Sequence, residues 1–338
     1  MIYVVIGFLW LSLLIYLLMG GADFGAGILE LFTPEHDRSH LRTTAYRAIG
    51  PIWEANHMWL IIAIVVLFVG FPEIYAVISV YLHIPLVIML LGIIARGTAF
   101  TFRNYDAKKD RMQQVYNRIY VYSSFITPLF LGIIAATAVS GRMDPGDSTF
   151  AGAYVFDWLN WFPLGVGFFT VFLCAFLAAI FLIGEATDDK GRLAFIRKSK
   201  GMIAATLFFA AFTFMVAAAE HIPLLHWILG SAYPVIASGV ALFSLVILLI
   251  RLGQNKLGSI RLLAGLMVTA LLIASTYSHF PNIIVFGNGT SLSLLKNCGP
   301  PLTIQTLGLA LLTGSVFILP ALFYLIYSFN SRAARGIE

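Results

Sequence analysis

The feature that most limits how this chain can fold is a succession of long apolar segments running through its 338 residues. A helix of about twenty apolar residues crosses the hydrocarbon core of a bilayer. Only 11% of the residues are charged and 60% are hydrophobic, which excludes a soluble globular domain of this size. The segment 60–70 lacks the polar stripe of a surface helix. The sequence therefore predicts an all-α integral membrane protein.

Nine transmembrane helices are expected from these segments. The first twenty residues lack a positively charged region ahead of the apolar stretch, so they form a membrane helix and not a cleaved signal peptide. We expect two four-helix bundles plus one peripheral helix: a first bundle over 1–141, a second over 142–280, and an outer loop with the final helix over 281–338. The segment 280–302 is a candidate for a loop that partly re-enters the membrane. The predicted spans are 3–31, 47–70, 74–102, 116–140, 162–186, 201–220, 232–251, 259–279 and 303–328.

The basic residues give the expected orientation. Of the 21 Lys and Arg residues, 18 lie in or beside the loops after the first, third, fifth and seventh helices, or in the C-terminal tail. Cytoplasmic loops carry such an excess. The N-terminus is therefore expected outside and the C-terminus in the cytoplasm, in a bacterial or archaeal cytoplasmic membrane. Because these residues fall in short loops, the net charge of +5 does not indicate a nucleic-acid partner.

The sequence contains no recognisable metal-binding motif. Cys-x-x-Cys, His-Glu-x-x-His and Cys/His clusters are all missing from it. We expect no disulfide, because Cys174 lies at mid-membrane and Cys298 in a loop. His57 or His83 could serve as an axial haem ligand. No pairing of such residues on facing helices is evident, so no haem is expected in this chain.

Two short stretches, Gly20–Gly27 and Gly50–Trp59, place ionisable residues at membrane depth. A charge at that depth is costly and is rarely accidental. With the expected orientation, Asp23, Glu54 and Arg96 lie in the cytoplasmic halves of the first three helices. Arg96 is the one basic residue that lies in neither the basic loops nor the alternate loops, since it falls inside the third predicted helix. It is therefore the expected partner of the buried acids.

The second stretch combines groups that can move a proton. Glu54 and His57 are three residues apart on a helix, and Trp53 and His57 are four apart, so each pair shares a face. A carboxylate and an imidazole one turn apart can pass a proton through a bridging water, and Asn56 adds an uncharged donor and acceptor. We expect these polar residues, with Asp23, to form a proton pathway. The alternatives are that Glu54 is a structural hydrogen-bond acceptor and that His57 is an ordinary interface residue.

Arg96 and the glycines are expected to support that pathway. A nearby cation lowers the pKa of a buried carboxylate, so Arg96 would tune the acids. Gly21 and Gly25 remove side-chain bulk beside Asp23, which lets another helix or a file of water approach. The alternatives are a purely structural Asp23–Arg96 ion pair and a glycine seam that serves helix packing alone.

Three motifs carry a family resemblance. They are the run from Gly20 to Gly27, the run Trp53-Glu54-Ala55-Asn56-x-x-Trp59-Leu60, and the run Arg96-Gly97-Thr98-Ala99-Phe100-x-Phe102-Arg103. In this order and spacing they resemble the signatures of subunit II of cytochrome bd-type terminal oxidases. The match extends through the first 140 residues. The second half is similar only in helix count and loop charge.

The resemblance implies a nine-helix chain that pairs with a homologous, haem-bearing subunit I. Haem b, with haem d as a further candidate, and the quinol site would then belong to subunit I, and this chain would bind no cofactor of its own. It would support the partner and conduct cytoplasmic protons toward the oxygen-reducing haem, as a non-haem subunit of a respiratory quinol oxidase that is inactive alone. A small accessory subunit and a structural quinone or lipid are compatible with this assignment.

The motifs also suggest roles for single residues. Asp23 matches the second acid of the family's Asp-Gly-Phe-Asp motif, and Glu54 matches the Asp of its Trp-Asp-Gly-Asn motif. Arg96 and Arg103 match the basic positions of the third-helix motif and are expected to tune charge. Trp59, like Trp53, is expected to pack around the site.

At three positions the chain departs from the family pattern. Gly20 replaces the first acid, His57 stands where Gln or Glu is usual, and Thr101 occupies a position often filled by Glu. One acid of the route is therefore missing and one titratable group has been gained.

Two other classes of protein fit the same residues. A proton-coupled secondary transporter also pairs membrane acids with an Arg and breaks its helices at Gly. Its acids would be expected near the midplane in both halves, whereas here they cluster toward the cytoplasm in the first half. A scaffold subunit with no proton role is the third hypothesis.

Overall fold

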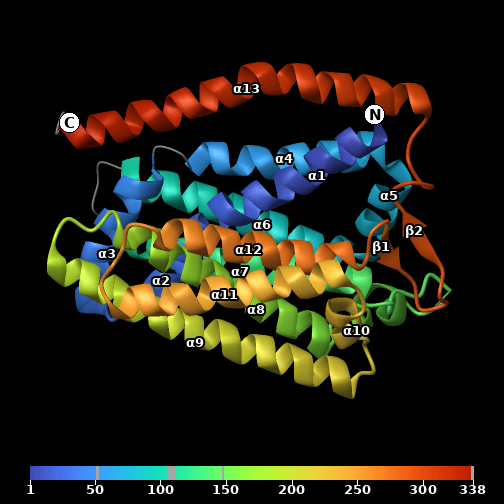
Figure 1. The fold of residues 1–338 in the computed structure, drawn as a ribbon, viewed down its shortest axis with the longest axis horizontal. Helices are drawn as coiled ribbons and strands as arrows, with labels where there is room; N and C mark the ends of the chain where they lie inside the picture. The colour runs from blue at the N-terminus through green and yellow to red at the C-terminus, as the bar shows by residue number, and fades with distance from the viewer. Residues whose placement is uncertain (51–52, 106–110, 147, 336–338) are drawn as a thin grey trace.

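The computed structural model describes residues 1–50, 53–105, 111–146 and 148–335; within these ranges, the side chains of Glu54, Asn104, Tyr105, Arg111 and most residues beyond 321 lie outside the description. Its long helices run roughly along one common direction (Figure 1). In chain order the helices and helical turns are α1 (Ile2–Ile15), the π-helical turn η1 (Tyr16–Gly20), α2 (Gly21–Leu31), α3 (Glu35–Ile49), α4 (Trp53–Gly70), α5 (Pro72–Tyr81), α6 (His83–Tyr105), α7 (Arg111–Val139), the π-helical turn η2 (Gly152–Phe156), α8 (Trp161–Ile183), α9 (Asp189–Ala219), α10 (Leu224–Leu229), α11 (Ala232–Gly253), α12 (Ile260–Tyr277) and α13 (Pro301–Arg335).

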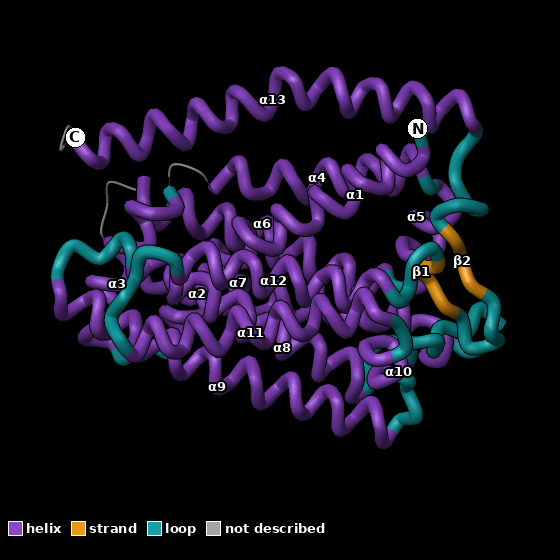
Figure 2. Tube along the Cα trace, in the orientation of Figure 1, coloured by secondary structure: helices purple, strands orange, loops and turns teal. Residues whose placement is uncertain are grey.

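The two ends of the bundle differ in structure. One end carries α3 and the C-terminus and is called the α3 end here. The other carries the N-terminus, α5, α10 and the strands β1 (Asn282–Val285) and β2 (Ser291–Ser293), and is called the hairpin end (Figure 2). α13 lies along one side of the bundle and contacts α1 and α4.

The all-α membrane fold is confirmed. Among the described residues, eight helices are long and apolar enough to cross a membrane. A ninth is reached when Ala55–Gly70 and Pro72–Tyr81, which meet at a bend of 114°, are counted as one span. Pro72 causes the bend, because a residue before proline avoids the helical conformation and Phe71 is accordingly non-helical (φ −139°, ψ 60°).

Two predicted boundaries are wrong. The second span was expected over 47–70, but residues 47–49 belong to α3, which ends at Ile49, and α4 begins at Trp53. The third was expected over 74–102, but α5 ends at Tyr81 and α6 begins at His83. Pro85 fits this break, since a proline in the first turn of a helix lacks only an N–H that would have no intrahelical partner.

The segment 280–302 forms a short β-hairpin, which the sequence did not predict. Its strands pair antiparallel, with Ile284 opposite Leu292 and Val285 opposite Ser291. Gly289 in the connecting turn has φ +80°, a left-handed conformation that glycine adopts without strain. The two strands are so short that their two-residue periodicity is not recognisable in a sequence dominated by apolar helices.

The core of the bundle is centred on α8. Its side chains are buried along most of its length, and it packs against α2, α7 and α9. One continuous apolar cluster joins residues of α2 and α3 to residues of α8, α9, α11 and α12. Whether the helices divide into units at 141 and 280 stays a prediction.

Candidate functional site

A buried ion pair between Asp23 on α2 and Arg96 on α6 forms the centre of the candidate site. Arg96 Nη1 donates to Asp23 Oδ2 at 2.7 Å, and Nη2 donates to Oδ1 at 2.6 Å. Nη2 also donates to the Asp23 carbonyl at 2.9 Å. The Asp23 side chain is 0% exposed and that of Arg96 is 1% exposed. The predicted pairing of these two residues is therefore confirmed, and its geometry is the bidentate form that gives the strongest carboxylate–guanidinium contacts.

Three further side chains enclose the guanidinium. Arg96 Nε donates to Ser124 Oγ at 3.0 Å, and Nη2 lies 3.2 Å from the Tyr120 hydroxyl, to which it donates. The rings of Phe24 and Tyr120 lie 4.9 and 5.0 Å from Cζ, which is the range of cation–π contact. Ser124 and Tyr120 are one turn apart on α7. The charge is thus fixed in place by three helices.

Glycines let α2 approach its neighbours closely. A Cβ on Gly25 would overlap the carbonyl oxygen of Cys174 on α8 and would lie 2.7 Å from Ala178 Cβ. A Cβ on Gly21 would lie 3.4 Å from Cys174 Sγ, and one on Gly27 would overlap the Ser124 hydroxyl. Gly25 and Gly27 therefore let other helices approach, whereas a Cβ on Gly21 would make an ordinary contact.

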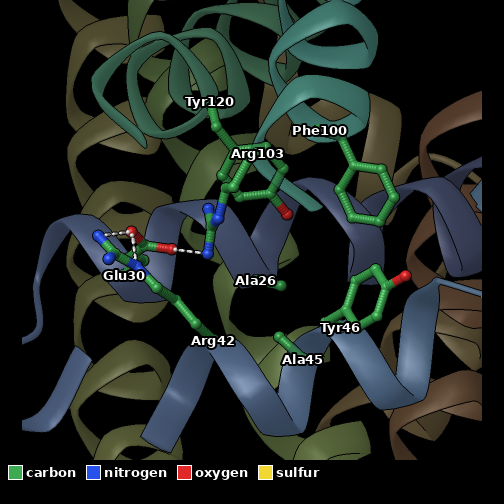
Figure 3. A pocket seen from close by; sticks show the side chains of 8 residues that line it. All are labelled: Ala26, Glu30, Arg42, Ala45, Tyr46, Phe100, Arg103 and Tyr120. Atoms are coloured by element: carbon green, nitrogen blue, oxygen red, sulfur yellow. Dashed lines mark hydrogen bonds and ion pairs between the residues drawn. The ribbon is translucent and has the colours of Figure 1, made fainter. Parts of the chain in front are cut away.

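A second buried carboxylate, Glu30, lies seven residues beyond Asp23 on α2. Its side chain is 2% exposed. Arg42 of α3 contacts its Oε1 at 2.7 Å, and Arg103 of α6 contacts its Oε2 at 2.9 Å (Figure 3). Arg103 is also seven residues beyond Arg96. Seven residues are about two helical turns, or about 10 Å, so α2 and α6 carry two acid–arginine pairs at matching intervals.

Tyr120 lies between the two ion pairs. Its ring is 4.6 Å from Arg103 Cζ and 5.0 Å from Arg96 Cζ, and Figure 3 shows it directly beside Arg103. Sequence reasoning placed neither Tyr120 nor Glu30 in the site. The seven-residue spacing of two acids on one helix and two arginines on another was the signal that could have found the second pair.

The face of α4 that carries Asn56, His57 and Trp59 lies next to this centre. The His57 ring is 6.4 Å from the Trp53 ring, as their four-residue spacing predicted, and 6.0 Å from the Phe24 ring, between ring centroids. Asn56 and Trp59 are 1% and 5% exposed. Glu54 lies in the first turn of α4, because α4 begins at Trp53. The side chain of Glu54 lies outside the described residues.

Four buried polar side-chain atoms, His57 Nδ1 among them, have no hydrogen-bond partner within the described part of the chain. They come from η1 and α4 and are the Tyr16 hydroxyl, Asn56 Oδ1, His57 Nδ1 and Trp59 Nε1. Native proteins rarely leave such atoms unsatisfied, and ordered water is the usual partner for them. The Tyr16 and His57 ring centroids are 6.4 Å apart. These four atoms, called the polar track here, therefore leave hydrogen-bonding groups unsatisfied on two neighbouring elements of an apolar bundle.

The turn that carries Tyr16 also includes one departure from the family pattern, Gly20. A π-helical turn covers Tyr16–Gly20, directly before the segment that carries Asp23, and such turns are frequent at functional sites. The Tyr16 ring covers Gly20, where a Cβ would lie 3.0 Å from the ring carbon Cε2. A side chain at position 20 would therefore need the Tyr16 ring to shift.

The two histidines considered as axial haem ligands lie in different surroundings. His57 is enclosed by the rings of Tyr16, Phe24 and Trp53. His83 Nδ1 lies 2.8 Å from the Val80 carbonyl of its own helix turn, within hydrogen-bond distance. Across residues 1–50, 53–105, 111–146 and 148–335, no group of three or more His, Cys, Asp or Glu side chains could hold a metal ion. Cys174 and Cys298 are both free, as expected.

Comparison with known proteins gives one consistent result. Residues 1–329 match the family Cytochrome bd terminal oxidase subunit II. The chain is 26% identical over 335 residues to the cytochrome bd ubiquinol oxidase subunit 2 of Bacillus subtilis, covering 96% of each chain. It is 28% identical over 144 residues to the cytochrome bd-I ubiquinol oxidase subunit 2 of Escherichia coli strain K12, which is 41% of this chain and 37% of that protein.

A solved structure has the same fold. A chain from the structure of bd oxidase from Geobacillus thermodenitrificans superimposes with a TM-score of 0.75, covering 97% of this chain and 98% of that chain. The two sequences are 19% identical.

Proposed function

Because the chain belongs to the cytochrome bd terminal oxidase subunit II family, we propose that its buried polar residues carry protons toward the site of oxygen reduction. As a member of that family it is a multi-pass membrane subunit of a quinol oxidase and works with a partner subunit. This membership removes the alternative of a proton-coupled secondary transporter. A scaffold subunit without a proton role remains the competing hypothesis.

The observation that carries the proposal is the track of unpartnered polar atoms on η1 and α4. Tyr16, Asn56, His57 and Trp59 each bury a polar atom with no partner in the described part of the protein. Water that satisfies these atoms would form a hydrogen-bonded file through an apolar region. Such a file passes protons by short transfers between neighbouring oxygens and nitrogens.

Asp23 and Arg96 supply the fixed charges of the pathway. Both carboxylate oxygens of Asp23 accept from Arg96, so the two side chains are held together by paired hydrogen bonds. In the proposed pathway the pair sets the electrostatic field in which the neighbouring groups gain and lose protons. Arg103 extends that field toward the α3 end through the Tyr120 ring.

Glu54 and His57 are the proposed proton carriers. The Glu54 carboxylate would take a proton from water and release it through a bridging water to the His57 imidazole, one turn further along α4. Asn56 would orient the bridging water through its amide. The imidazole would then release a proton to the next water of the file, so each group returns to its starting state.

The direction of transfer follows from the proposed orientation. The α3 end carries most of the basic loops and would face the cytoplasm under the positive-inside rule. The hairpin end, with the N-terminus, would then lie outside, and the membrane would be the cytoplasmic membrane of a bacterium or archaeon. Uptake from the cytoplasm at the α3 end would make the oxidase reaction separate charge.

The haems and the quinol site are proposed to lie in a partner subunit I, as the family resemblance implies. In this proposal subunit I carries haem b, with haem d as a further candidate beside it, and a small accessory subunit is compatible with the assembly. A structural lipid or quinone could occupy a cavity of about 740 Å³ where the first residues of α1 meet the start of α13. It is lined by Met1, Ile2, Cys298, Gly299, Pro300, Pro301, Ile304 and Gln305.

Oxygen consumption by the purified complex with quinol tests the proposal. The variant Glu54→Gln keeps the size of the side chain but cannot carry a proton, so turnover should fall at least about tenfold, given that positioned proton donors contribute ~10²–10⁴. Glu35→Gln, on the exposed surface of α3, is the matched control and should leave turnover unchanged. Wild-type turnover in Glu54→Gln would favour the scaffold hypothesis.

A further inference from the structure

Glu30 is a buried acid for which the pathway through Glu54 and His57 has no use. It lies at the α3 end of α2, and its side chain is 2% exposed. Arg42, which contacts it from α3, is 32% exposed, whereas Arg103, which contacts it from α6, is 10% exposed. Glu30 is therefore separated from solvent mainly by one partly exposed arginine.

A small cavity adjoins these three charged residues. It has a volume of about 10 Å³, roughly what one water molecule needs. Its walls come from α2, α3, α6 and α7 (Figure 3), and its lining residues are Ala26, Glu30, Arg42, Ala45, Tyr46, Phe100, Arg103 and Tyr120. The cavity thus borders both Glu30 and Tyr120.

One polar group beside the cavity lacks a partner within the described part of the chain. Arg103 Nη1 is buried and makes no hydrogen bond there, although Nη2 of the same side chain binds Glu30. A guanidinium N–H needs an acceptor when it is buried. A water in the cavity supplies such an acceptor, and its own protons can then point to Glu30 and to the Tyr120 hydroxyl.

Aromatic contacts connect the cavity to the start of α4. The Phe100 ring lies 6.1 Å from Tyr120 and 5.1 Å from Trp53, between ring centroids. Trp53 directly precedes Glu54 in the chain. On the other side, the Tyr120 hydroxyl accepts a hydrogen bond from Arg96. The cavity therefore lies between the α3 end and the residues assigned to the pathway above.

From this arrangement we propose that Glu30 is the entry acid of the proton pathway, and that a water in the adjoining cavity links it to the Tyr120 hydroxyl. The inference rests on the proposed function. Arg42 and Arg103 are positioning residues, because they hold the carboxylate at the edge of the cavity.

The transfer conserves protons at each step. Glu30 takes a proton from solvent water at the α3 end, and its O–H bond then breaks as the cavity water accepts that proton. The cavity water passes one of its own protons to the Tyr120 oxygen, and the phenolic proton of Tyr120 passes to a water on the Arg96 side, which is the first water of the proposed file. The two arginines and Glu30 carry a net charge of +1, which disfavours a free hydronium ion there. The proton therefore moves by concerted transfers between oxygens.

The experiment uses the complete detergent-purified oxidase and measures oxygen consumption with quinol, together with the rate at which quinol reduces the haems. Glu30→Gln should lower turnover at least about tenfold with haem reduction unchanged. Tyr120→Phe keeps the ring beside both arginines and should lower turnover several-fold. Its matched control is Tyr122→Phe, because Tyr122 lies on the same helix and is exposed.

A double variant separates proton transfer from charge balance. Glu30→Gln leaves both arginines without their carboxylate, whereas Glu30→Gln with Arg42→Gln restores the net charge of +1. If Glu30 passes protons, the double variant stays slow, because the acceptor is still missing. Recovery of wild-type turnover in the double variant, or no loss in Glu30→Gln, would overturn the proposal. Slow turnover of Glu54→Gln alongside normal Glu30→Gln would leave the proposed function intact and reject only this inference.

Discussion

The substitution Arg96→Gln tests the buried ion pair most severely. It removes the donors to both carboxylate oxygens of Asp23 and to its carbonyl, and the contacts to Ser124 and Tyr120. Because Asp23 is fully buried, its charge is then left without a partner. Breaking a buried pair on one side costs about 3–5 kcal/mol. We expect a loss of stability of this size and a complex that loses its haem at lower temperature than wild type.

A double-mutant cycle gives the reference for this cost. Asp23→Asn combined with Arg96→Gln leaves no uncompensated charge, so the double variant should be more stable than Arg96→Gln alone by about 2 kcal/mol or more. Thermal unfolding of the purified complex, followed by tryptophan fluorescence and haem absorbance, measures all four corners of the cycle. A loss below about 1 kcal/mol in Arg96→Gln, the range of exposed pairs, would refute the argument that this pair is dry and closely coupled.

Two further predictions concern packing and pH. Gly25→Ala should destabilise the complex by about 1–3 kcal/mol in thermal unfolding, because the new methyl group overlaps the Cys174 carbonyl. Gly7→Ala is the control, since a Cβ on Gly7 would have no atom within 4 Å, and it should leave the stability almost unchanged. His279, which follows α12 and packs against Trp227 at 4.4 Å between ring centroids, has a pKa lowered by burial to about 4. Since the folded pKa lies below the ordinary value of 6.5, its stabilising effect is complete above pH 6.5 and is lost as the pH falls toward 4. The melting temperature should therefore fall less between pH 7 and 5 in His279→Phe than in wild type, and equal falls would contradict the assignment.

Most of the membrane fold could be predicted from the chain because apolar length and loop charge are properties of the sequence alone. The Asp23–Arg96 pair could also be predicted, since two opposite charges at one depth have few other partners. The boundaries at 47–70 and 74–102 could not. Proline and glycine residues interrupt the helices locally, while the surrounding sequence stays apolar and gives no sign of the interruption.

The second ion pair escaped prediction for a different reason. Glu30 lies near the expected end of the first span, where an acid is usually solvated, and only the fold shows that α3 covers it with Arg42. Tyr120 and Tyr16 escaped because aromatic residues are common in membrane helices, so their hydroxyls carry no signal until the burial and the neighbours are known. The polar track on η1 and α4 likewise depends on tertiary contacts.

The most direct test of the central claim is the proton uptake that accompanies oxygen reduction. The fully reduced complex in detergent is mixed with oxygen, and a pH-sensitive dye follows protons taken from the medium while haem absorbance follows the reaction. In Glu54→Gln we predict that proton uptake and the haem step coupled to it slow together by at least about tenfold, while Glu35→Gln matches wild type. Proton uptake at the wild-type rate in Glu54→Gln would contradict the assignment of a proton pathway to this chain.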